Sequence, residues 1–563
     1  MQSWLFRNEC IYNDVEQPAS QSIGLGIVDR YKDTDPDIFP LIEGKRATWH
    51  DHQLCFMNPK TVELFAREAA SLLRATPKRA KRLNLGLGDN WSVCTCEMCL
   101  RPITLPDGRV IDKDAPNFRS TQYAHFALGV YERLKKEFPY IEPISAQAYI
   151  FTAVPSALKY PGGGGTYCPY IKNHKKPVYD DGANAHWHEM AEGFKKAGMP
   201  FSGLYEYYLC DTTPQYYHAT MEVMQKDLAY YGDALKEVYL DGGYADGPNG
   251  VEVRNTGSVY EASAIEFWVC SRLMWDPTID VKAARREFCR RAYHGAEKLM
   301  GDYYERLAEV YNADPAGCFW NDDAISAAKN YIVEKGLAAW QRETLAKAER
   351  AATDPRSKEL IRRHRVYMDH IVSIAEKAPK RVELHVGKDW TELGPITHCG
   401  DVTKTTPGRT RIWMRNDNKV LECKYELKND RLRKLFDEYK AAGKVGTSQD
   451  DEVGFDWSNC VEFFIDGRLR EGGSYFHLCT MVNERTHTGF GTSKATEPTP
   501  WGVKVEAIDG GVRGIVTWPL ASLGIDISKG NKVGMMVTGN GDSWNGGQQH
   551  APTSFQTLVL NMD

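Results

Sequence analysis

The sequence predicts an α/β fold in which a TIM-type (β/α) barrel, incomplete at its N-terminal side, is followed by a helical bundle and an antiparallel β-sandwich. Amphipathic helical patterns alternate with short apolar strands over much of residues 1–280. Long charged helical patterns fill residues 281–378, and short alternating strands separated by Gly, Asn and Asp fill residues 385–563. We therefore expect three domains with these bounds, of which the first is of the catalytic type.

The first unit of the barrel begins with a helix. Asn58 and Pro59 form an N-cap and first-turn pair, and apolar residues recur at helical spacing as far as Leu73. The segment LNLGLGD, residues 83–89, is expected to be a strand, and a long loop follows it. Helix, strand and loop in this order are typical of parallel βα units.

The unit then repeats along the chain. Helices are expected at residues 123–134, 187–196 and 216–231, leading to the strands PISAQAY, FSGLYEYY and EVYLDGG. In such folds the loops after the carboxyl ends of the strands carry the functional site. A closed barrel needs eight units, so we expect either a chain that begins inside the barrel or a barrel that is open or irregular.

The composition suggests neither a nucleic-acid partner nor a membrane partner. The 70 basic and 75 acidic residues give a formal net charge of −5, which suits neither a nucleic-acid groove nor an anionic membrane surface. No run of about 18 apolar residues suggests a membrane span, and the segment MQSWLFRNEC does not resemble an export signal. Aromatic residues make up 11% of the chain, and flat aromatic faces suit sugar rings. The oligomeric state stays open.

A series of motifs resembles a bacterial family, the domain-of-unknown-function family numbered 4838. The motifs are DPDIFPLIEGKR, QLCFMNP, CTCEMC, AQAY, YEYY and WDPTIDVKAARREFCRRAYHGAEKLMGDYY, in this order over residues 1–310. That family overlaps glycoside hydrolase family 163, the retaining endo-β-N-acetylglucosaminidases of complex N-glycans, and is more distantly similar to the family 67 and family 20 barrels. The resemblance implies a hydrolase of β-linked N-acetylhexosaminides that uses paired carboxylates or substrate-assisted acid/base catalysis.

The C-terminal segment resembles a family 9 carbohydrate-binding module, through FDWSNCVEFFIDG, GIVTWPL and WNGGQQHAPTSFQTLVL. The two resemblances together imply a glycan or polysaccharide partner, a role in polysaccharide degradation, and a secreted, cell-surface or periplasmic location. The alternative is a non-catalytic carbohydrate-binding protein with a degenerate or truncated barrel.

Three acidic residues at predicted strand ends are candidates for the chemistry, because glycoside hydrolysis uses two carboxyl groups that flank the bond. Glu206 is the catalytic candidate of first choice, since adjacent tyrosine rings raise the pKa of a carboxyl group toward that of a general acid; otherwise it is a buried residue that accepts tyrosine hydroxyls. Asp89 is predicted to be the second catalytic group, as partner carboxylate or by orienting an acetamido group, or else to cap a turn. Asp241 is predicted to bind a sugar hydroxyl, or else to form a DGG turn.

Four further residues are candidates for substrate binding. Tyr149 and His174 match positions near the cleft of the resembled family, which implies hydrogen bonds to sugar hydroxyls. Tyr208 belongs to the same aromatic segment as Glu206. Trp187 is either a stacking platform or part of helix packing.

The C-terminal segment offers tryptophans as sugar platforms. Trp501 and Trp544 lie in polar, turn-rich segments, where an exposed ring would stack on a pyranose face. The alternation of the strands places Trp457 and Trp518 in the core of the sandwich, and Trp413 also lies in a strand pattern.

The cysteine cluster in WSVCTCEMC has three open interpretations. Cys94, Cys96 and Cys99 have a spacing close to that of zinc or iron-sulfur sites, and Cys55 offers a fourth thiolate. Disulfides and packed free thiols are the alternatives. In each case we expect the cluster to brace the loop after Asp89 rather than to be catalytic.

The remaining motifs predict no cofactor. The triplets HDH, residues 50–52, and HWH, residues 186–188, lack the spacing of a metal site, so we assign no metal ligand to the candidate site. The run GGGG, residues 162–165, lacks the Lys and Ser/Thr of a phosphate loop and is interpreted as a flexible loop.

Overall fold

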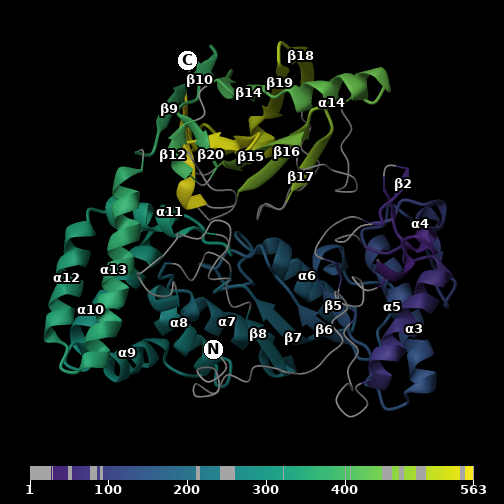
Figure 1. Cartoon of the computed structure of the whole chain (residues 1–563), viewed down its shortest axis with the longest axis horizontal. Helices are drawn as coiled ribbons and strands as arrows, with labels where there is room; N and C mark the ends of the chain where they lie inside the picture. The colour runs from purple at the N-terminus through teal and green to yellow at the C-terminus, as the bar shows by residue number, and fades with distance from the viewer. Residues whose placement is uncertain are drawn as a thin grey trace.

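The chain combines an α/β part, a helical bundle and a two-sheet β part (Figure 1). In Figure 1 the β part lies above the other two, with the bundle on the left. The computed structural model describes residues 27, 29–42, 44–48, 53–75, 85, 87–88, 93–210, 216–240, 260–320, 322–378, 380–399, 401–405, 408–446, 459–467, 475–489, 502–545 and 552–561.

A parallel sheet forms the centre of the α/β part. Its four strands lie in the order β5-β6-β7-β8, and all neighbouring pairs are parallel. Their carboxyl ends therefore lie along one edge, where α/β folds place their sites. Over the described residues this sheet is open, so the TIM-type barrel is not confirmed. The strands are β5 (Ala146–Ala148), β6 (Gly164–Tyr167), β7 (Phe201–Glu206) and β8 (Glu237–Leu240).

Helices precede or connect these strands largely where the periodicity predicts them. The expected strand at residues 83–89 lies largely outside the described residues. The helices are α3 (Pro59–Ala75), α5 (Phe118–Glu137), α6 (Ala185–Lys196) between β6 and β7, and α7 (Met221–Tyr231) between β7 and β8.

The second half of the glycine run at residues 162–165 forms a strand, so the prediction of a flexible loop was wrong for Gly164 and Gly165. Gly164 and Gly165 begin β6, between β5 and β7. A Cβ atom on Gly164 would lie 2.2 Å from the carbonyl oxygen of Met199, and one on Gly165 would lie 2.5 Å from that of Ala146. The glycines therefore let the backbone pack too closely against both neighbours for any side chain.

Short elements cluster beside α3 and α5 (Figure 1). Each pair of these two-residue strands forms only a small antiparallel sheet. Such short strands contribute little stability of their own. They are β1 (Leu41–Ile42), β2 (Lys45–Arg46), β3 (Ile103–Thr104) and β4 (Val110–Ile111), with η1 (Pro36–Ile38), η2 (Ile150–Thr152) and α4 (Glu97–Leu100).

The bundle follows β8 in the chain. It buries a core rich in tyrosine, with Tyr303, Tyr304 and Tyr367 among its members. No described helix combines the length and apolar character needed to cross a membrane. The helices are α8 (Tyr260–Leu273), α9 (Val281–Ala292), α10 (Glu297–Ala313), α11 (Ala324–Ala328), the π-helical η5 (Lys329–Val333), α12 (Ala338–Ala351) and α13 (Pro355–Lys377), with η4 (Gly232–Ala234) before β8.

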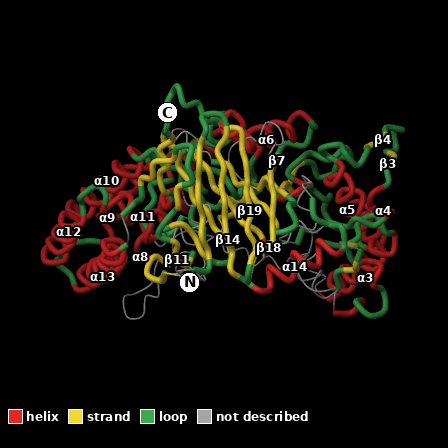
Figure 2. The backbone as a smooth tube through the Cα atoms, turned by 90° about the horizontal axis from the view of Figure 1, so that it is seen from above, coloured by secondary structure: helices red, strands yellow, loops and turns green. Residues whose placement is uncertain are grey.

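The C-terminal part is a β-sandwich, as predicted, with one sheet ordered β10-β13-β14-β19-β18 and a second built on β12-β11-β21-β20-β15-β16-β17. Figure 2 shows β14, β19 and β18 of the first sheet side by side. All strand pairs are antiparallel except β9 with β22.

The strands of the first sheet are β10 (Thr391–Glu392), β13 (Thr410–Asn416), β14 (Val420–Lys428), β18 (Gly502–Ile508) and β19 (Gly511–Pro519). Those of the second are β9 (Glu383–Val386), β11 (Ile396–His398), β12 (Asp401–Thr405), β15 (Cys460–Asp466), β16 (Phe476–Met481), β17 (Thr486–Gly489), β20 (Lys532–Gly539), β21 (Asp542–Trp544) and β22 (Gln556–Leu560). One further helix, α14 (Asp430–Ala441), and two 3-10 turns, η7 (Leu520–Leu523) and η8 (Pro552–Ser554), complete it.

The sandwich packs directly on the α/β part and the bundle. Phe464, Tyr475 and Phe555 of the sandwich belong to the same apolar core as the parallel sheet. Thr553 donates a hydrogen bond of 2.6 Å from Oγ1 to Oδ1 of Asp322, which lies just before α11. The three parts therefore share buried surfaces.

Candidate active site

Glu206 is the last residue of β7 and lies at the carboxyl edge of the parallel sheet. Its side chain is 0% exposed. Burial raises the pKa of Glu206 from 4.5 to about 7; the ammonium group of Lys172 opposes this rise and the carboxylate of Asp227 adds to it. A carboxyl group that is partly protonated at neutral pH can act as a general acid.

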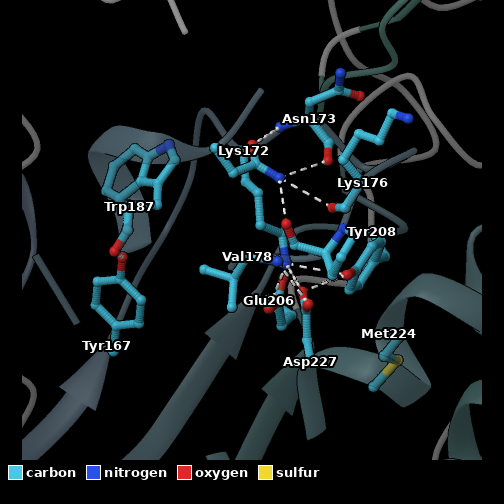
Figure 3. A network of polar contacts seen from close by, with 12 residues as sticks. Tyr167, Lys172, Asn173, Lys176, Val178, Trp187, Glu206, Tyr208, Met224 and Asp227 are labelled. Carbon is cyan, nitrogen blue, oxygen red and sulfur yellow. Dashed lines mark hydrogen bonds and ion pairs between the residues drawn. The ribbon is translucent and has the colours of Figure 1, made fainter. Parts of the chain in front are cut away.

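Lys172, in the loop after β6, joins the two buried carboxylates (Figure 3). Its Nζ donates to Oε1 of Glu206 at 2.7 Å and to Oδ2 of Asp227, and both carboxylates are fully buried. Burial disfavours the charged form of Lys172, but the attraction of Asp227 and Glu206 outweighs it and the pKa of Lys172 is raised. The centre therefore holds an ammonium ion between two acidic groups.

Both carboxylate oxygens of Asp227, on α7, accept hydrogen bonds. Its Oδ1 accepts the backbone N–H of Val178 at 2.7 Å. Its Oδ2 accepts Lys172 and the hydroxyl of Tyr208, the latter at 2.8 Å. Tyr208 also accepts a hydrogen bond of 3.0 Å from Lys172, whose Nζ lies 4.4 Å from the centre of its ring. We call Lys172, Glu206, Tyr208 and Asp227 the Lys172 centre.

Among the described residues, several buried polar atoms at this centre have no hydrogen-bond partner. They include Oε2 of Glu206 and both ring nitrogens of His174. The His174 ring packs 4.8 Å from the Tyr208 ring, centre to centre. Burial, together with Lys172 and His218, holds the pKa of His174 well below its usual range, so its imidazole is neutral. Unpaired buried polar atoms are rare and require an explanation.

A second polar group lies next to His174. The backbone N–H of His174 donates to the carbonyl of Cys318 at 2.7 Å. His218 Nε2 lies 3.4 Å from Asp322 Oδ2, and possible ligand atoms of His218, Cys318 and Asp322 lie within 4.8 Å of one another. These residue types ligate metal ions. Oδ1 of Asp322 already accepts a hydrogen bond from Thr553, so this carboxylate also has a structural role where the bundle meets the sandwich.

The end of β5 is strained. Ile150 has a φ of 50°, in the left-handed region that a β-branched residue rarely adopts. Tyr149 precedes it and is half-buried, with its ring centre 5.2 Å from that of Tyr170. Because such strain clusters at functional sites, the edge that carries Glu206 has a second unusual feature at β5.

Two of the predicted binding residues have structural roles. Trp187 is buried on α6 against the rings of Tyr167 and Tyr170, and its carbonyl accepts the Tyr167 hydroxyl at 2.6 Å (Figure 3). Its ring therefore serves helix packing and is not an open stacking platform. Tyr208 is also fully buried, and its hydroxyl is engaged by Lys172 and Asp227.

One of the predicted sugar platforms of the sandwich lies deeper than predicted. Trp544 is fully buried in β21 and directs its Nε1 toward the carbonyl of Gly394, 3.4 Å away, so the expectation of an exposed platform was wrong. Trp518 is in the core, as predicted. Trp413 is buried under Arg411 and Lys424, whose charged groups lie 4.6 and 4.2 Å from its ring centre.

Other predicted residues lie outside the described part of the chain. These are Asp89, Asp241, Trp457 and Trp501. Their predicted roles stay predictions.

Lys172 and Asp227 were missed by the sequence reasoning. Asp227 carried a usable signal, because it follows Met221 and Met224 at helical spacing on the buried face of α7. An acidic residue on an apolar face is rarely buried unless it is paired. Lys172 lies two residues before His174 but shows no such pattern.

A comparison with protein families shows to which family the chain belongs. The family described as "Domain of unknown function (DUF4838)" matches residues 24–305. The chain belongs to this family. The DUF4838 region contains the Lys172 centre and His174, whereas Cys318 and Asp322 lie beyond it.

The comparisons with curated proteins and with solved structures do not extend the DUF4838 assignment. No curated protein matches the sequence. A family 9 carbohydrate-binding module from Caldicellulosiruptor kristjanssonii with cellotriose is 13% identical over 32% of this chain and 94% of its own, with a TM-score of 0.22. The same kind of module with glucose is 12% identical over 32% and 96%, with a TM-score of 0.21. Scores this low carry no argument about fold or ligand.

Proposed function

We propose that the protein is a glycoside hydrolase in which Glu206 is the general acid. The observation that carries this proposal is a fully buried carboxyl group at the carboxyl edge of a parallel sheet. Its pKa is about 7, and one of its oxygens has no partner among the described residues. The substrate class, β-linked N-acetylhexosaminides, is suggested by the motif resemblance alone, as is the overlap with glycoside hydrolase family 163.

In this mechanism the proton on Oε2 of Glu206 passes to the glycosidic oxygen as the bond to the sugar breaks. The Lys172 ammonium, already bonded to Oε1 at 2.7 Å, stabilises the carboxylate that remains. Asp227 is a positioning residue, because it keeps Lys172 charged and in place. Since both Asp227 oxygens accept hydrogen bonds, it is poorly suited to attack the sugar.

The second catalytic group in the proposal is Asp89, which either acts as the partner carboxylate or orients the acetamido group of the substrate. The neutral ring of His174 offers two nitrogens for sugar hydroxyls. Tyr149 directly follows β5 at this edge and is proposed to bind a further hydroxyl. Asp241, the residue after Leu240 in the sequence, is proposed to bind another.

A non-catalytic glycan-binding protein is the second candidate. The observation that favours it is the burial of the whole centre: Lys172, Glu206 and Asp227 are each 0% exposed, and the ammonium group stabilises Glu206 as a carboxylate. In that case the charged centre is structural, and glycans bind elsewhere on the chain.

The test is the release of sugars from a panel of N-glycans and aryl hexosaminides, followed by mass spectrometry. Glu206→Gln should lower kcat by about 10²–10⁴-fold. The matched control is Glu237→Gln, because Glu237 begins β8 at the opposite edge of the same sheet, and it should leave kcat unchanged.

Equal activity in Glu206→Gln and the unmodified protein would overturn the assignment of the acid. Binding of glycans by the unmodified protein without any hydrolysis would support the second candidate instead.

A further inference from the structure

The four cysteines of the α/β part converge on one point. Cys55 precedes α3, whereas Cys94, Cys96 and Cys99 lie in or next to α4. The Sγ atom of Cys55 lies 3.6 Å from each of the other three. All four sulfur atoms lie within 4.8 Å of one another and all four residues are buried.

These distances do not describe disulfides. A disulfide requires about 2.05 Å between sulfur atoms, and all four cysteines are free. Four sulfur ligands around a tetrahedral zinc ion, each about 2.3 Å from the metal, lie about 3.8 Å from one another. The spacing of the cluster is therefore that of a tetrahedral thiolate site.

The surroundings supply donors for thiolate sulfur. The backbone N–H groups of Leu41 and Cys96 donate to Sγ of Cys94 at 3.2 and 3.5 Å. Nη1 of Arg46 lies 3.9 Å from the same sulfur and adds a positive charge. Such hydrogen bonds orient metal ligands and stabilise their negative charge.

We propose that Cys55, Cys94, Cys96 and Cys99 bind one structural zinc ion as four thiolates. Zinc fits because four cysteines at tetrahedral spacing fill its coordination shell and leave no position for a substrate or water. Leu41, Met57 and Met98 cover the cluster with apolar surface. This proposal does not depend on the proposed hydrolase activity.

The zinc ion would join segments that lie far apart in the sequence. Cys55 belongs to the stretch before α3, and the other ligands lie near the two-residue strands β1 to β4. Helix α5 supports the site from outside, because Gln122 Nε2 donates to the carbonyl of Cys99 and Arg119 donates to that of Cys94 at 3.1 Å. The ion thus fixes this corner of the α/β part onto α3 and α5.

The test is the metal content of the full chain, purified without a histidine tag and measured by plasma mass spectrometry. We expect about one zinc ion per chain, and cobalt exchanged into the protein should give the absorption bands of a tetrahedral thiolate complex. Cys96→Ser/Cys99→Ser should lose the zinc. Cys289→Ser, which changes a buried free cysteine of α9, should retain it.

Three results would overturn the proposal. One is a metal-free protein in which all four cysteines of the cluster react as free thiols with iodoacetamide after unfolding. Another is a protein mass that is lower by two hydrogens for each disulfide, which would show that the cysteines of the cluster are oxidised. The third is iron in place of zinc. Because the metal content and the cobalt spectrum of the unmodified protein need no variant, failure of the double variant to fold leaves the test intact.

Discussion

The Lys172 centre and the cysteine cluster are both buried in the α/β part, but they balance charge in different ways. Lys172 places one ammonium ion between two carboxylates, so side chains of the chain itself provide most of the compensation. The cysteine cluster brings four acidic groups of one kind together, and among the described residues Arg46 is the cation that lies next to a sulfur atom. A set of four thiolates requires a bound cation, whereas the Lys172 centre already contains one.

This difference indicates which role each region suits. In the Lys172 centre one oxygen of Glu206 has no partner among the described residues, and the pKa of Glu206 lies near neutrality, which suits proton transfer. The cysteine cluster has every proposed ligand directed at one point, which suits a closed structural site.

Replacing Lys172, the cation of the Lys172 centre, should have the largest effect on stability. Lys172→Met leaves two carboxylates buried without a counterion, and we expect a loss of about 3–5 kcal/mol in the free energy of unfolding. Urea unfolding at pH 7 measures it. Lys347→Met, which removes an exposed i,i+4 partner of Glu343, should change the free energy by less than about 0.5 kcal/mol. Equal effects of the two substitutions would contradict a charge-balanced centre.

The free energy of unfolding should also depend on pH, because Glu206 titrates differently in the folded and unfolded chain. Because the pKa of Glu206 rises from 4.5 unfolded to about 7 folded, its contribution to stability is fully present below pH 4.5 and is lost as the pH rises through 7. Glu206→Gln cannot titrate, so it should gain stability relative to the unmodified protein between pH 4.5 and 8, by on the order of 3 kcal/mol. Urea unfolding at several pH values tests this, and a constant difference would show that the pKa is not raised.

The support of the cysteine cluster should give a smaller effect. Gln122→Ala removes the side chain that donates a hydrogen bond to the Cys99 carbonyl. We expect a loss of about 1–3 kcal/mol in the free energy of unfolding and a roughly tenfold lower affinity for zinc. Unfolding and competition with a chelator measure the two effects. Gln225→Ala removes donors to the carbonyls of Pro277 and Ile279 and should leave zinc affinity unchanged. A similar change in zinc affinity in both variants would contradict the role of Gln122.

The sequence predicted local structure better than tertiary contacts. Periodicity located α6, α7, β7 and β8, and with them the position of Glu206 at a strand end. It missed β6, because a glycine run has no hydrophobic pattern, and only the close packing of Gly164 against its neighbours explains that strand.

The candidate site could be predicted only in part. Glu206 pairs with Lys172, 34 residues away, and through it with Asp227, 55 residues from Lys172. These distances along the chain are bridged by the order of the strands, which local sequence does not contain. Trp544 was misplaced for a related reason: its polar neighbours suggested a surface turn, but pairing with β11 and β20 brings it into the core.

The parallel pair of β9 and β22 has a consequence for the order of synthesis. β9 follows directly after the bundle, and its partner β22 is the last described strand, so the second sheet cannot be completed until residues 556–560 have been made. Chains grow at about 5–20 residues per second and domains tend to fold from the N-terminus. The α/β part and the bundle thus emerge from the ribosome well before the sandwich can close, and a nascent chain that stops early would expose the edge of β9.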